Sequence, residues 1–598
     1  MSVITFLRSA IRKMPRMLIL GGSGMGFFII LLLLLTPTID DISLEENGRT
    51  LPLQNIEVTS WSRSPFKIRF GLRTNMLQKH TLHATVKGCI QGFSVNGKEG
   101  VLPYPCTASG TGLMRQDIDL RPFIENGWNY VQVTLLTPKY LVGQPMKFSF
   151  LPSPFADRGF IVIRWLVLFI LVSCTLLIVR TWITKDPWIV ILLIVGVIIR
   201  WKYAFATDIE VRSYDWWGHI DYVRYLSNTW SIPPAAGGWE FQQPPLYYAI
   251  GALILKASTY LGWPQGFSLF WVQHCSLPLS VATLLTGTWI GTLLFKNDVR
   301  WTKYIFVSMI AALPGFVMVS SRLSNDALIT PLIFLSCGML LLWWKNPSWK
   351  LWIGIWIVAS LAFLTKANGI GIVPGVILTA ICQRKIGIGD RRVFCMSGIL
   401  LFLIAVSWLP VARLHQSTAD LRNYLATGTM TINPALRINH TVADFLTFNP
   451  IEVLKHPFIN TYKDESRRKN FFEFLFRSAL FGEFSHFKKP QFSISILLYA
   501  LLLLPWMIWG MISEIRTKSE CSLPFLLFSF SVLCTAIAYA MFSQFSHVQD
   551  FRLFLLLGLT STFLMIRGIE KSPSIPQLAG IIISIFLSLL MGAFMFLQ

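Results

Sequence analysis

Long apolar runs recur along most of this chain, with short polar loops between them. Runs of roughly 17–25 apolar residues are long enough to cross a bilayer as helices, and about thirteen candidates can be placed. They lie near residues 17–36, 159–179, 187–205, 270–295, 304–320, 327–344, 351–365, 369–382, 393–411, 493–514, 522–542, 551–566 and 575–597. Only 14% of the residues are charged, against about 25% in soluble domains. The pattern predicts a polytopic α-helical membrane protein.

Residues 40–157 follow a different pattern. Polar and apolar positions alternate over 67–73 and 130–136, and Asn96-Gly97 and Asn126-Gly127 are turn signals. We predict a small antiparallel β-sandwich, and the runs 93–98 and 117–133 resemble the end of a galactose-binding-like jelly roll. Cys89 and Cys106 share this domain, and a disulfide between them stays open. Carbohydrate binding and a purely structural role are both open for the domain.

These patterns divide the chain into five parts. They are an N-terminal segment with the first apolar run (1–39), the β-sandwich (40–157), a helical core with an outer loop at 206–268 (158–411), a long loop region (412–491) and the last apolar helices (492–598). In the long loop region, 464–483 has phenylalanines on one helical face and charges on the other, which predicts an amphipathic helix in the headgroup zone.

The short loops indicate an orientation. Lys and Arg gather on alternate loops, as at 180–185, 296–303, 345–350, 384–392, 516–518 and 567–571. The positive-inside rule places these loops and the N-terminus in the cytoplasm, if 246–261 lies flat or re-entrant. The regions 40–157, 206–268 and 412–491 are then extracytoplasmic. We predict an integral inner (plasma) membrane protein. The net charge of +22 does not indicate nucleic acid, because the chain has no soluble basic domain.

The predicted outer side collects polar side chains. The loop 214–248 holds Asp215, His219, Asp221 and Glu240 among tryptophans and tyrosines. Carboxylates beside a bilayer are costly unless they do chemistry or meet a polar partner. Other polar groups next to apolar runs on this side are Arg322, Asn325, Asp326, Lys366, Asn368, Glu483, His486, His547, Gln549, Asp550 and Arg552. Transfer of a sugar from a lipid-linked phosphate needs such a set: a carboxylate as general base and cations for the departing phosphate.

At this point the chain resembles the GT-C superfamily of membrane glycosyltransferases, in the branch of the protein O-mannosyltransferases and the lipid A aminoarabinose transferase. The motifs that carry the resemblance are Asp215 with His219, Gln243-Pro-Pro-Leu-Tyr-Tyr248, Ser324-Asn-Asp-Ala-Leu328, Leu364-Thr-Lys-Ala-Asn-Gly369 and the Phe-Gly-Glu that ends at Glu483. Trp216 stands where many relatives have Glu, so Asp208 and Asp221 stay open as alternative bases. The two apolar runs and the β-domain that precede the usual first helix suggest a specialised acceptor.

The resemblance implies roles for individual residues. Catalytic roles fall to Asp215, Asp326 and His219, and binding of the donor phosphate to Lys366, Arg552 and Arg322. Substrate-binding roles fall to Asp221, Glu240, Gln243, Tyr247 and Glu483. The implied donor is a polyprenyl-phosphate sugar, and the acceptor a cell-envelope glycan, glycolipid or protein. We expect no obligatory cofactor and no metal site, although use of a divalent metal stays open.

Plainer interpretations of these residues also stay open. Asp215 and Asp326 can cap helices, and Lys366 can extend toward the interface from the end of a membrane span. For the whole protein, the alternatives are an O-antigen polymerase or ligase, a lipid-glycan transporter or flippase, and a sugar-binding scaffold. A transporter normally has ionisable residues in mid-span and internal repeats, whereas here the polar groups gather on one side.

Overall fold

The structure is a computed structural model. It describes the chain except for residues 1–37, 47–48, 53–56, 60–65, 75–80, 88, 101–112, 121–122, 124–126, 137–144, 153–157, 208–214, 236, 239, 261–270, 297, 410–437, 439, 460–467, 483–490, 518–521 and 543–548. The predictions for the apolar run 17–36, Cys106, Asp208 and Glu483 therefore lie outside the described residues. The chain forms two compact units, Met1–Val167 with Ile254–Trp271, and Leu168–Leu253 with Val272–Gln598. We describe each unit by itself.

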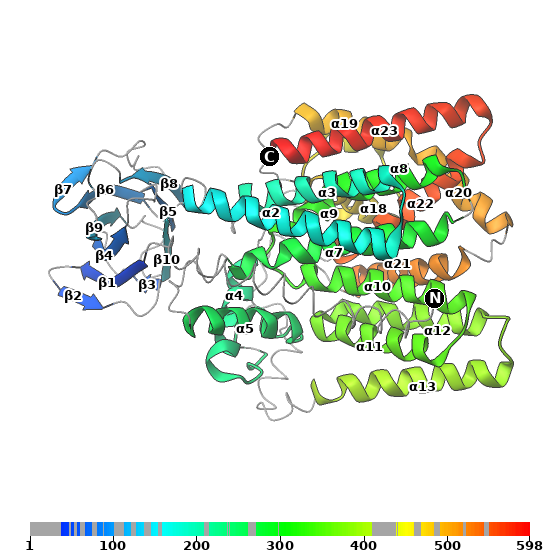
Figure 1. Ribbon diagram of the computed structural model, residues 1–598, viewed down its shortest axis with the longest axis horizontal. Helices are drawn as coiled ribbons and strands as arrows, with labels where there is room; N and C mark the ends of the chain where they lie inside the picture. The colour runs from blue at the N-terminus through cyan, green and yellow to red at the C-terminus, as the bar shows by residue number, and fades with distance from the viewer. Residues whose placement is uncertain are drawn as a thin grey trace. The chain divides into compact units, whose positions relative to one another are not determined.

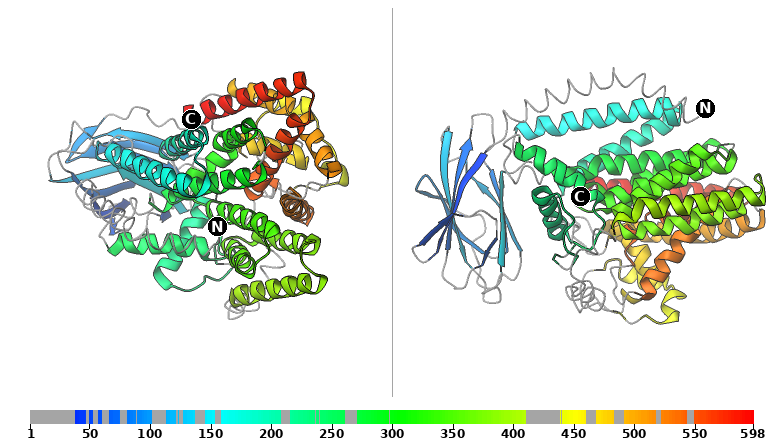
Figure 2. Two further views of the ribbon diagram at one scale, coloured as in Figure 1. Left: turned by 45° about the vertical axis from the view of Figure 1, so that its right-hand side comes forward. Right: turned by 90° about the horizontal axis from the view of Figure 1, so that it is seen from below.

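Within its described residues, the first unit has ten strands in two antiparallel sheets (Figure 2). The strands are β1 (Thr38–Glu46), β2 (Arg49–Pro52), β3 (Glu57–Thr59), β4 (Phe66–Thr74), β5 (Thr81–Lys87), β6 (Cys89–Val95), β7 (Lys98–Gly100), β8 (Leu113–Asp119), β9 (Gly127–Leu136) and β10 (Pro145–Pro152). One sheet has the order β2-β1-β4-β9-β6-β7 and the other β3-β10-β5-β8.

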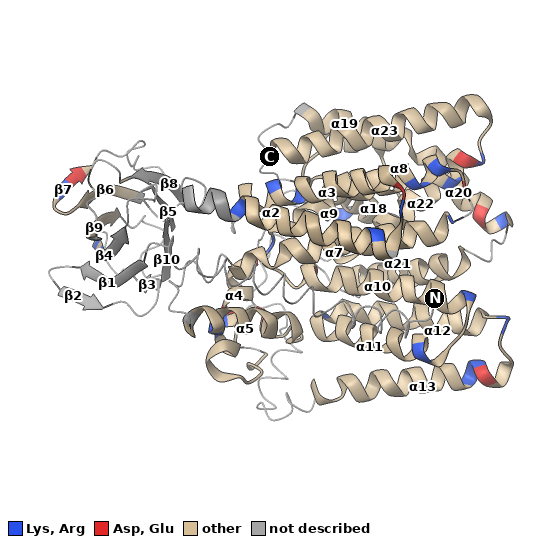
Figure 3. Ribbon diagram, in the orientation of Figure 1, with Lys and Arg blue, Asp and Glu red and all other residues tan. Residues whose placement is uncertain are grey.

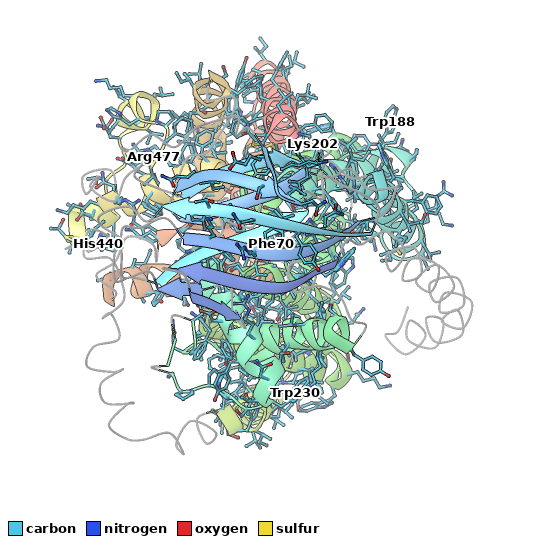
Figure 4. All side chains as sticks on the ribbon, turned by 90° about the vertical axis from the view of Figure 1, so that its left-hand side faces the viewer. Phe70, Trp188, Lys202, Trp230, His440 and Arg477 are labelled. Atoms are coloured by element: carbon cyan, nitrogen blue, oxygen red, sulfur yellow. The ribbon has the colours of Figure 1, made fainter. Side chains whose placement is uncertain are left out.

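The alternating segments of the sequence form the centre of the larger sheet. In β4, Ile68 and Phe70 are buried while Lys67 and Arg69 are exposed, and Phe70 is labelled in Figure 4. This is the pattern of a strand with one face on a core. Asn96 and Gly97, both with positive φ (51° and 80°), turn the chain from β6 into β7. The turn follows from the sequence, because Asn-Gly is the dipeptide that tolerates two such residues in a tight hairpin.

The second unit is helical (Figure 1). Its α-helices, of which α2 and α5 also extend into the first unit, are α2 (Arg158–Ile178), α3 (Pro187–Ala206), α4 (Trp216–Thr229), α5 (Leu246–Tyr260), α7 (Ser276–Leu294), α8 (Arg300–Ala312), α9 (Pro314–Met318), α10 (Asp326–Lys345), α11 (Trp349–Thr365), α12 (Ile372–Cys382), α13 (Ile388–Val406), α16 (Pro450–Lys455), α18 (Phe471–Phe481), α19 (Gln491–Leu502), α20 (Leu504–Thr517), α21 (Leu523–Phe542), α22 (Leu556–Glu570) and α23 (Ser574–Leu597). Short segments of other helix types are η2 (Val179–Ile183), η3 (Val319–Ser321), η4 (Ala367–Gly371), η6 (Val442–Phe445) and η8 (Phe551–Leu553).

Several of these helices can cross a membrane. Within the described residues, seven are long and apolar enough, and the bent pair α8–α9 raises the number to eight. The segments 246–258, 349–365 and 367–382 are shorter apolar helices. The prediction of several apolar helical spans is confirmed. The described residues hold seven or eight such spans, fewer than the roughly thirteen that the sequence predicts.

The chain bends by 49° between α8 and α9. Pro314 has no backbone N–H, and a break at such a residue leaves carbonyl groups without their helical partners. The fully buried side chain of Arg200, from α3, donates hydrogen bonds to the carbonyl oxygens of Ile310 (3.1 Å) and Ala311 (2.8 Å). It also donates to the hydroxyl of Ser280 at 3.2 Å. Arg200 therefore replaces the missing intrahelical partners at the bend.

Charged residues mark one end of the helical unit. α10 begins at Asp326 and ends at Lys345, and the next helix, α11, returns to Lys366. The predicted basic loops at 345–350 and 384–392 thus lie at the end opposite to Asp326 and Lys366, and Figure 3 shows Lys and Arg gathered there. This separation is what the sequence predicts for a positive-inside protein. The side of the membrane that each end faces remains a prediction.

The late loop region contains a described helix, α18, within the segment 464–483. Its two charged side chains, those of Glu473 and Arg477, lie 3.5 Å apart and are 3% and 0% exposed. Phe471 and Phe474 are also buried, so residues on several faces of α18 are covered within the unit. Residues 464–467 and Glu483 lie outside the described residues, and an amphipathic helix in the headgroup zone stays a prediction.

Candidate active site

Four segments that are far apart in the sequence bring their charged side chains together within the second unit. They are the start of α4, the start of α10, the junction of α11 and η4, and η8. Each position is a helix end or a break, where side chains can leave the regular packing of the spans.

Asp215 precedes α4 as its N-cap residue, but its side chain makes no capping hydrogen bond. The carboxylate instead lies 3.5 Å from the guanidinium of Arg552 (Nη2 to Oδ2). The side chain of Asp215 is 26% exposed, and that of Arg552 is 10% exposed. The structure therefore does not use this carboxylate as a simple helix cap.

Asp326 is the first residue of α10 and is fully buried. Its Oδ1 lies 2.6 Å from the ammonium group of Lys366, and its Oδ2 accepts a hydrogen bond from the hydroxyl of Ser324 at 2.9 Å. These two contacts use both carboxylate oxygens, as a buried charge requires. Asp326 and Lys366 form a short, charge-assisted ion pair.

Lys366 lies at the junction of α11 and η4, where the helix breaks. Its backbone is extended (φ −156°, ψ 138°) and ends α11. The chain then folds back closely: a Cβ at Gly369 would lie 2.7 Å from the backbone carbon of Ala362. Only glycine fits such an approach. The Leu-Thr-Lys-Ala-Asn-Gly sequence thus makes the break that presents Lys366.

Arg552 belongs to η8, and Asp550 caps this short helix. The Oδ1 of Asp550 accepts from the backbone N–H of Arg552 (3.0 Å), and its Oδ2 lies 3.4 Å from the Nε of the same arginine. Asn368 of η4 donates to the carbonyl oxygen of Leu553 at 2.9 Å. This bond ties the segment that carries Lys366 to the segment that carries Arg552.

Two further groups of this site titrate abnormally. Burial lowers the pKa of His219 to about 4, and burial raises the pKa of Glu240 to about 8. Both groups respond to the same four charges, those of Asp215, Asp326, Lys366 and Arg552. The six residues therefore share one electrostatic environment, and we call them the acid–base cluster. At neutral pH it holds a neutral imidazole, a protonated Glu240, two carboxylates and two cations.

An aromatic layer supports the cluster from α4 and α5. The Nδ1 of His219 lies 2.8 Å from the hydroxyl of Tyr248, and the ring of Tyr248 stacks on Tyr222 with centroids 4.0 Å apart. The amide of Asn325 lies 3.4 Å from the same hydroxyl and 3.4 Å from the Oε1 of Gln243. Tyr248, Asn325 and Asp550 had no assigned role in the sequence. The Pro-Pro-Leu-Tyr-Tyr motif was the signal that pointed to Tyr248.

The other predicted site residues are placed less centrally. Tyr247 is buried beside Tyr248, with ring centroids 5.6 Å apart. Asp221 faces Arg224 at 3.7 Å, and its side chain is 43% exposed, so it is not among the residues that the cluster brings together. Arg322 is 3% exposed, and its carbonyl oxygen accepts a hydrogen bond from the hydroxyl of Ser276. Its Nη2 lies near Gly482, where an added Cβ would be 3.6 Å away. Among the described residues, Arg322 has no carboxylate partner within ion-pair distance.

Among the residues that the structure describes, no group of three or more His, Cys, Asp or Glu side chains is arranged to hold a metal ion. The side chains of the cluster can themselves carry out acid–base and electrostatic chemistry. Asp215 can accept a proton, while Lys366 and Arg552 can neutralise an anionic leaving group.

Residues 244–410 match the family model for dolichyl-phosphate-mannose-protein mannosyltransferases. This segment begins at the first proline of Pro-Pro-Leu-Tyr-Tyr and includes Asp326 and Lys366, whereas Asp215 and Arg552 lie outside it. The resemblance to GT-C glycosyltransferases, predicted from the motifs, is thereby confirmed over this segment.

Several solved structures show partial similarity to this chain. ArnT from Cupriavidus metallidurans in the apo state aligns at 13% identity over 66% of this chain and 62% of its own, with a TM-score of 0.40. The oligosaccharyltransferase of Archaeoglobus fulgidus in the apo form aligns at 12% identity over 69% and 56%, with a TM-score of 0.39. The arabinosyltransferase EmbB from Mycobacterium smegmatis aligns at 11% identity over 92% and 52%, with a TM-score of 0.39. This chain thus spans less than two thirds of each of these proteins. No curated protein sequence matches the chain.

Proposed function

We propose that this protein is an integral membrane glycosyltransferase that moves a sugar from a polyprenyl-phosphate donor to a cell-envelope acceptor on the extracytoplasmic face. The observation that carries the proposal is the acid–base cluster. It joins two carboxylates and two cations from four segments at the end of the helices opposite to the basic loops. The family match over residues 244–410 supports a lipid-phosphate donor.

The proposed reaction is a direct displacement with inversion at the anomeric carbon. An acceptor hydroxyl oxygen attacks this carbon and gives its proton to the carboxylate of Asp215. The bond between the anomeric carbon and the phosphate oxygen breaks, and its electron pair leaves with the polyprenyl phosphate. The positive charges of Arg552 and Lys366 stabilise this phosphate as its negative charge grows. Asp326 holds Lys366, and neutral His219 orients the acceptor.

Arg322 supplies a further argument for an anionic ligand. A buried guanidinium costs several kcal/mol of desolvation unless an anion compensates it. Arg322 is 3% exposed without a carboxylate neighbour among the described residues, and it precedes Asp326 by four residues in the sequence. We assign it to the donor phosphate together with Lys366 and Arg552. Glu240, Gln243, Tyr247 and Glu483 are proposed to contact the sugar or the acceptor, and Asp221 is proposed to bind at the rim.

The β-rich unit is proposed to be a jelly-roll-like β-sandwich that selects the acceptor. Its sheets have the alternating pattern of such a domain, and the sequence places it on the same side of the membrane as the cluster. The acceptor is proposed to be an envelope glycan, glycolipid or protein.

The charged residue inside a membrane span, Arg200, gives little support to the transporter alternative. Arg200 in α3 is engaged by two carbonyl oxygens and a serine hydroxyl at the bend of α8 and α9. A side chain fixed in this way stabilises the backbone and is not arranged to carry a substrate.

The test is transfer of labelled sugar by the purified protein in lipid nanodiscs, with polyprenyl-phosphate sugars as donors and envelope extracts as acceptors. Asp215→Asn is expected to abolish transfer while the protein stays folded and still binds polyprenyl phosphate. Near-normal turnover by Asp215→Asn would remove it as the base. Movement of an intact lipid-linked sugar across the bilayer without formation of a product would favour the transporter.

A further inference from the structure

The two ion pairs of the cluster differ in a way that bears on how the site is switched on. Lys366 and Asp326 are 2.6 Å apart, with side chains 14% and 1% exposed. Arg552 and Asp215 are 3.5 Å apart, with side chains 10% and 26% exposed. Charge-assisted hydrogen bonds normally span about 2.7–2.9 Å. The first pair is thus tight and buried, and the second is long and open to water.

Arg552 has a fixed partner and a replaceable one. Asp550, with a side chain 1% exposed, contacts both the backbone N–H and the Nε of Arg552. Asp215 faces the outer nitrogen, Nη2, at the longer distance of 3.5 Å. Because Asp550 also caps η8, its departure would unwind that helix. The side chain of Asp215 makes no such capping bond and is the more exposed of the two carboxylates, so its ion pair with Arg552 is the easier one to exchange.

The charges allow one more anion at Arg552 only if Asp215 moves. One guanidinium already faces two carboxylates, which leaves an excess of one negative charge. A lipid phosphate entering beside both would face two like charges within a few ångströms, and such repulsion is costly in a partly buried site. The phosphate and the Asp215 carboxylate therefore compete for the same face of Arg552.

We propose that the donor phosphate displaces Asp215 from Arg552, and that this exchange releases the carboxylate to act as the base. In the free protein Asp215 occupies the place of the phosphate and is held in an ion pair. When a polyprenyl-phosphate sugar binds, Arg552 keeps Asp550 and takes the phosphate, and Asp215 turns to the acceptor hydroxyl. The donor must then bind before the acceptor is deprotonated. This inference rests on the proposed function and adds an order of binding to it.

The experiment is titration of the full-length protein in nanodiscs with polyprenyl phosphate that carries no sugar, followed by native mass spectrometry. Asp215→Asn removes the competing charge and is expected to bind polyprenyl phosphate about two- to tenfold more tightly than the unmodified protein, the range for a partly exposed ion pair. A purely structural role for the pair would weaken binding or leave it unchanged.

Asp298→Asn is the matched control. Asp298 also pairs with an arginine, Arg567, at 2.9 Å, but it belongs to the loop between α7 and α8 at the basic end of the unit. Its replacement is expected to leave the affinity unchanged. If Asp298→Asn tightened binding as much as Asp215→Asn, the effect would be one of overall charge, and the exchange would be refuted.

The remaining outcomes separate the inference from the proposed function. Arg552→Lys keeps a cation for Asp550 but loses the Nη2 face, and it is expected to bind polyprenyl phosphate more weakly than the unmodified protein. If the unmodified protein binds polyprenyl phosphate and Asp215→Asn does not bind it more tightly, the exchange is wrong while the proposed function stands. If neither the unmodified protein nor any variant binds polyprenyl phosphate, both the proposed function and the exchange are wrong.

Discussion

The ion pair between Lys366 and Asp326 gives the sharpest stability prediction. Each side chain is to be replaced alone and both together, as Asp326→Leu, Lys366→Met and the double variant. Either single change leaves an ionised group in a site where its partner was 2.6 Å away and where Asp326 is fully buried. The double change leaves an apolar pair of similar volume.

The magnitude follows from the geometry. At 2.6 Å, and with an effective dielectric constant of about 20, the attraction is about 6 kcal/mol. Removing two ions from water costs several kcal/mol for each, so the pair as a whole contributes little to net stability. Breaking it from one side is different and is expected to cost about 3–5 kcal/mol. The double variant is expected to recover most of this loss, with a coupling energy above about 2 kcal/mol.

The assay is unfolding of the purified variants in mixed micelles by titration with SDS, followed by far-UV circular dichroism. Thr517→Ala at the end of α20, which removes a hydroxyl bonded to the Ser513 carbonyl at 2.9 Å, serves as a control for an ordinary polar change. If the effects of the two single replacements simply added, with coupling below about 0.5 kcal/mol, the pair would not be formed in the protein.

Four further predictions concern the acid–base cluster and the residues beside it. Because the pKa of Glu240 is raised to about 8, Glu240 is protonated at neutral pH and ionises as the pH rises through about 8. The added negative charge repels the donor phosphate, so the rate of sugar transfer is expected to fall above about pH 8. If the pH–rate profile of Glu240→Gln fell in the same way, this prediction would be contradicted. The raised pKa of Glu240 also affects stability. Between the ordinary glutamate value near pH 4.5 and about pH 8, Glu240 is ionised in the unfolded chain but protonated in the folded protein. The free energy of unfolding of the unmodified protein is therefore expected to fall as the pH rises through this range, and that of Glu240→Gln is not. Arg322→Gln is expected to raise the KM for the donor about tenfold, the loss of a charge-assisted contact, whereas an unchanged KM with altered unfolding alone would show a structural role. Tyr248→Phe removes the hydroxyl next to His219 and Asn325 and is expected to reduce kcat about five- to tenfold with donor affinity kept, and a change in KM alone would refute a positioning role.

Much of the helical framework could be predicted because membrane spans depend mainly on length and hydropathy. The strands also followed from alternation, and the Asn96-Gly97 turn from the backbone freedom of those two residues. The number of spans was harder to predict. A run such as 388–406 holds Asp390 and two arginines in its first turns, and 304–320 is interrupted at Pro314.

The site could be predicted only as a set of residue types on one side. Sequence order does not show which cation meets which carboxylate, because those pairings depend on how α4, α10, α11 and η8 pack. Asp550 illustrates the difficulty: the sequence assigns it no role, and the structure shows that it both caps η8 and fixes Arg552. The burial of Glu473 with Arg477 on α18 was missed for the same reason, since their spacing also fits an exposed helix face.

The bend at Pro314 has a consequence for the evolution of this protein. The proline lies at the start of α9, and the arginine that bonds the freed carbonyl groups lies on α3, more than a hundred positions earlier. A lineage that restores a straight helix at 314 takes two acceptors from Arg200 at membrane depth, and one that loses Arg200 first leaves bare carbonyl groups there. The two positions are therefore expected to be inherited together, and descendants that lack one should lack the other.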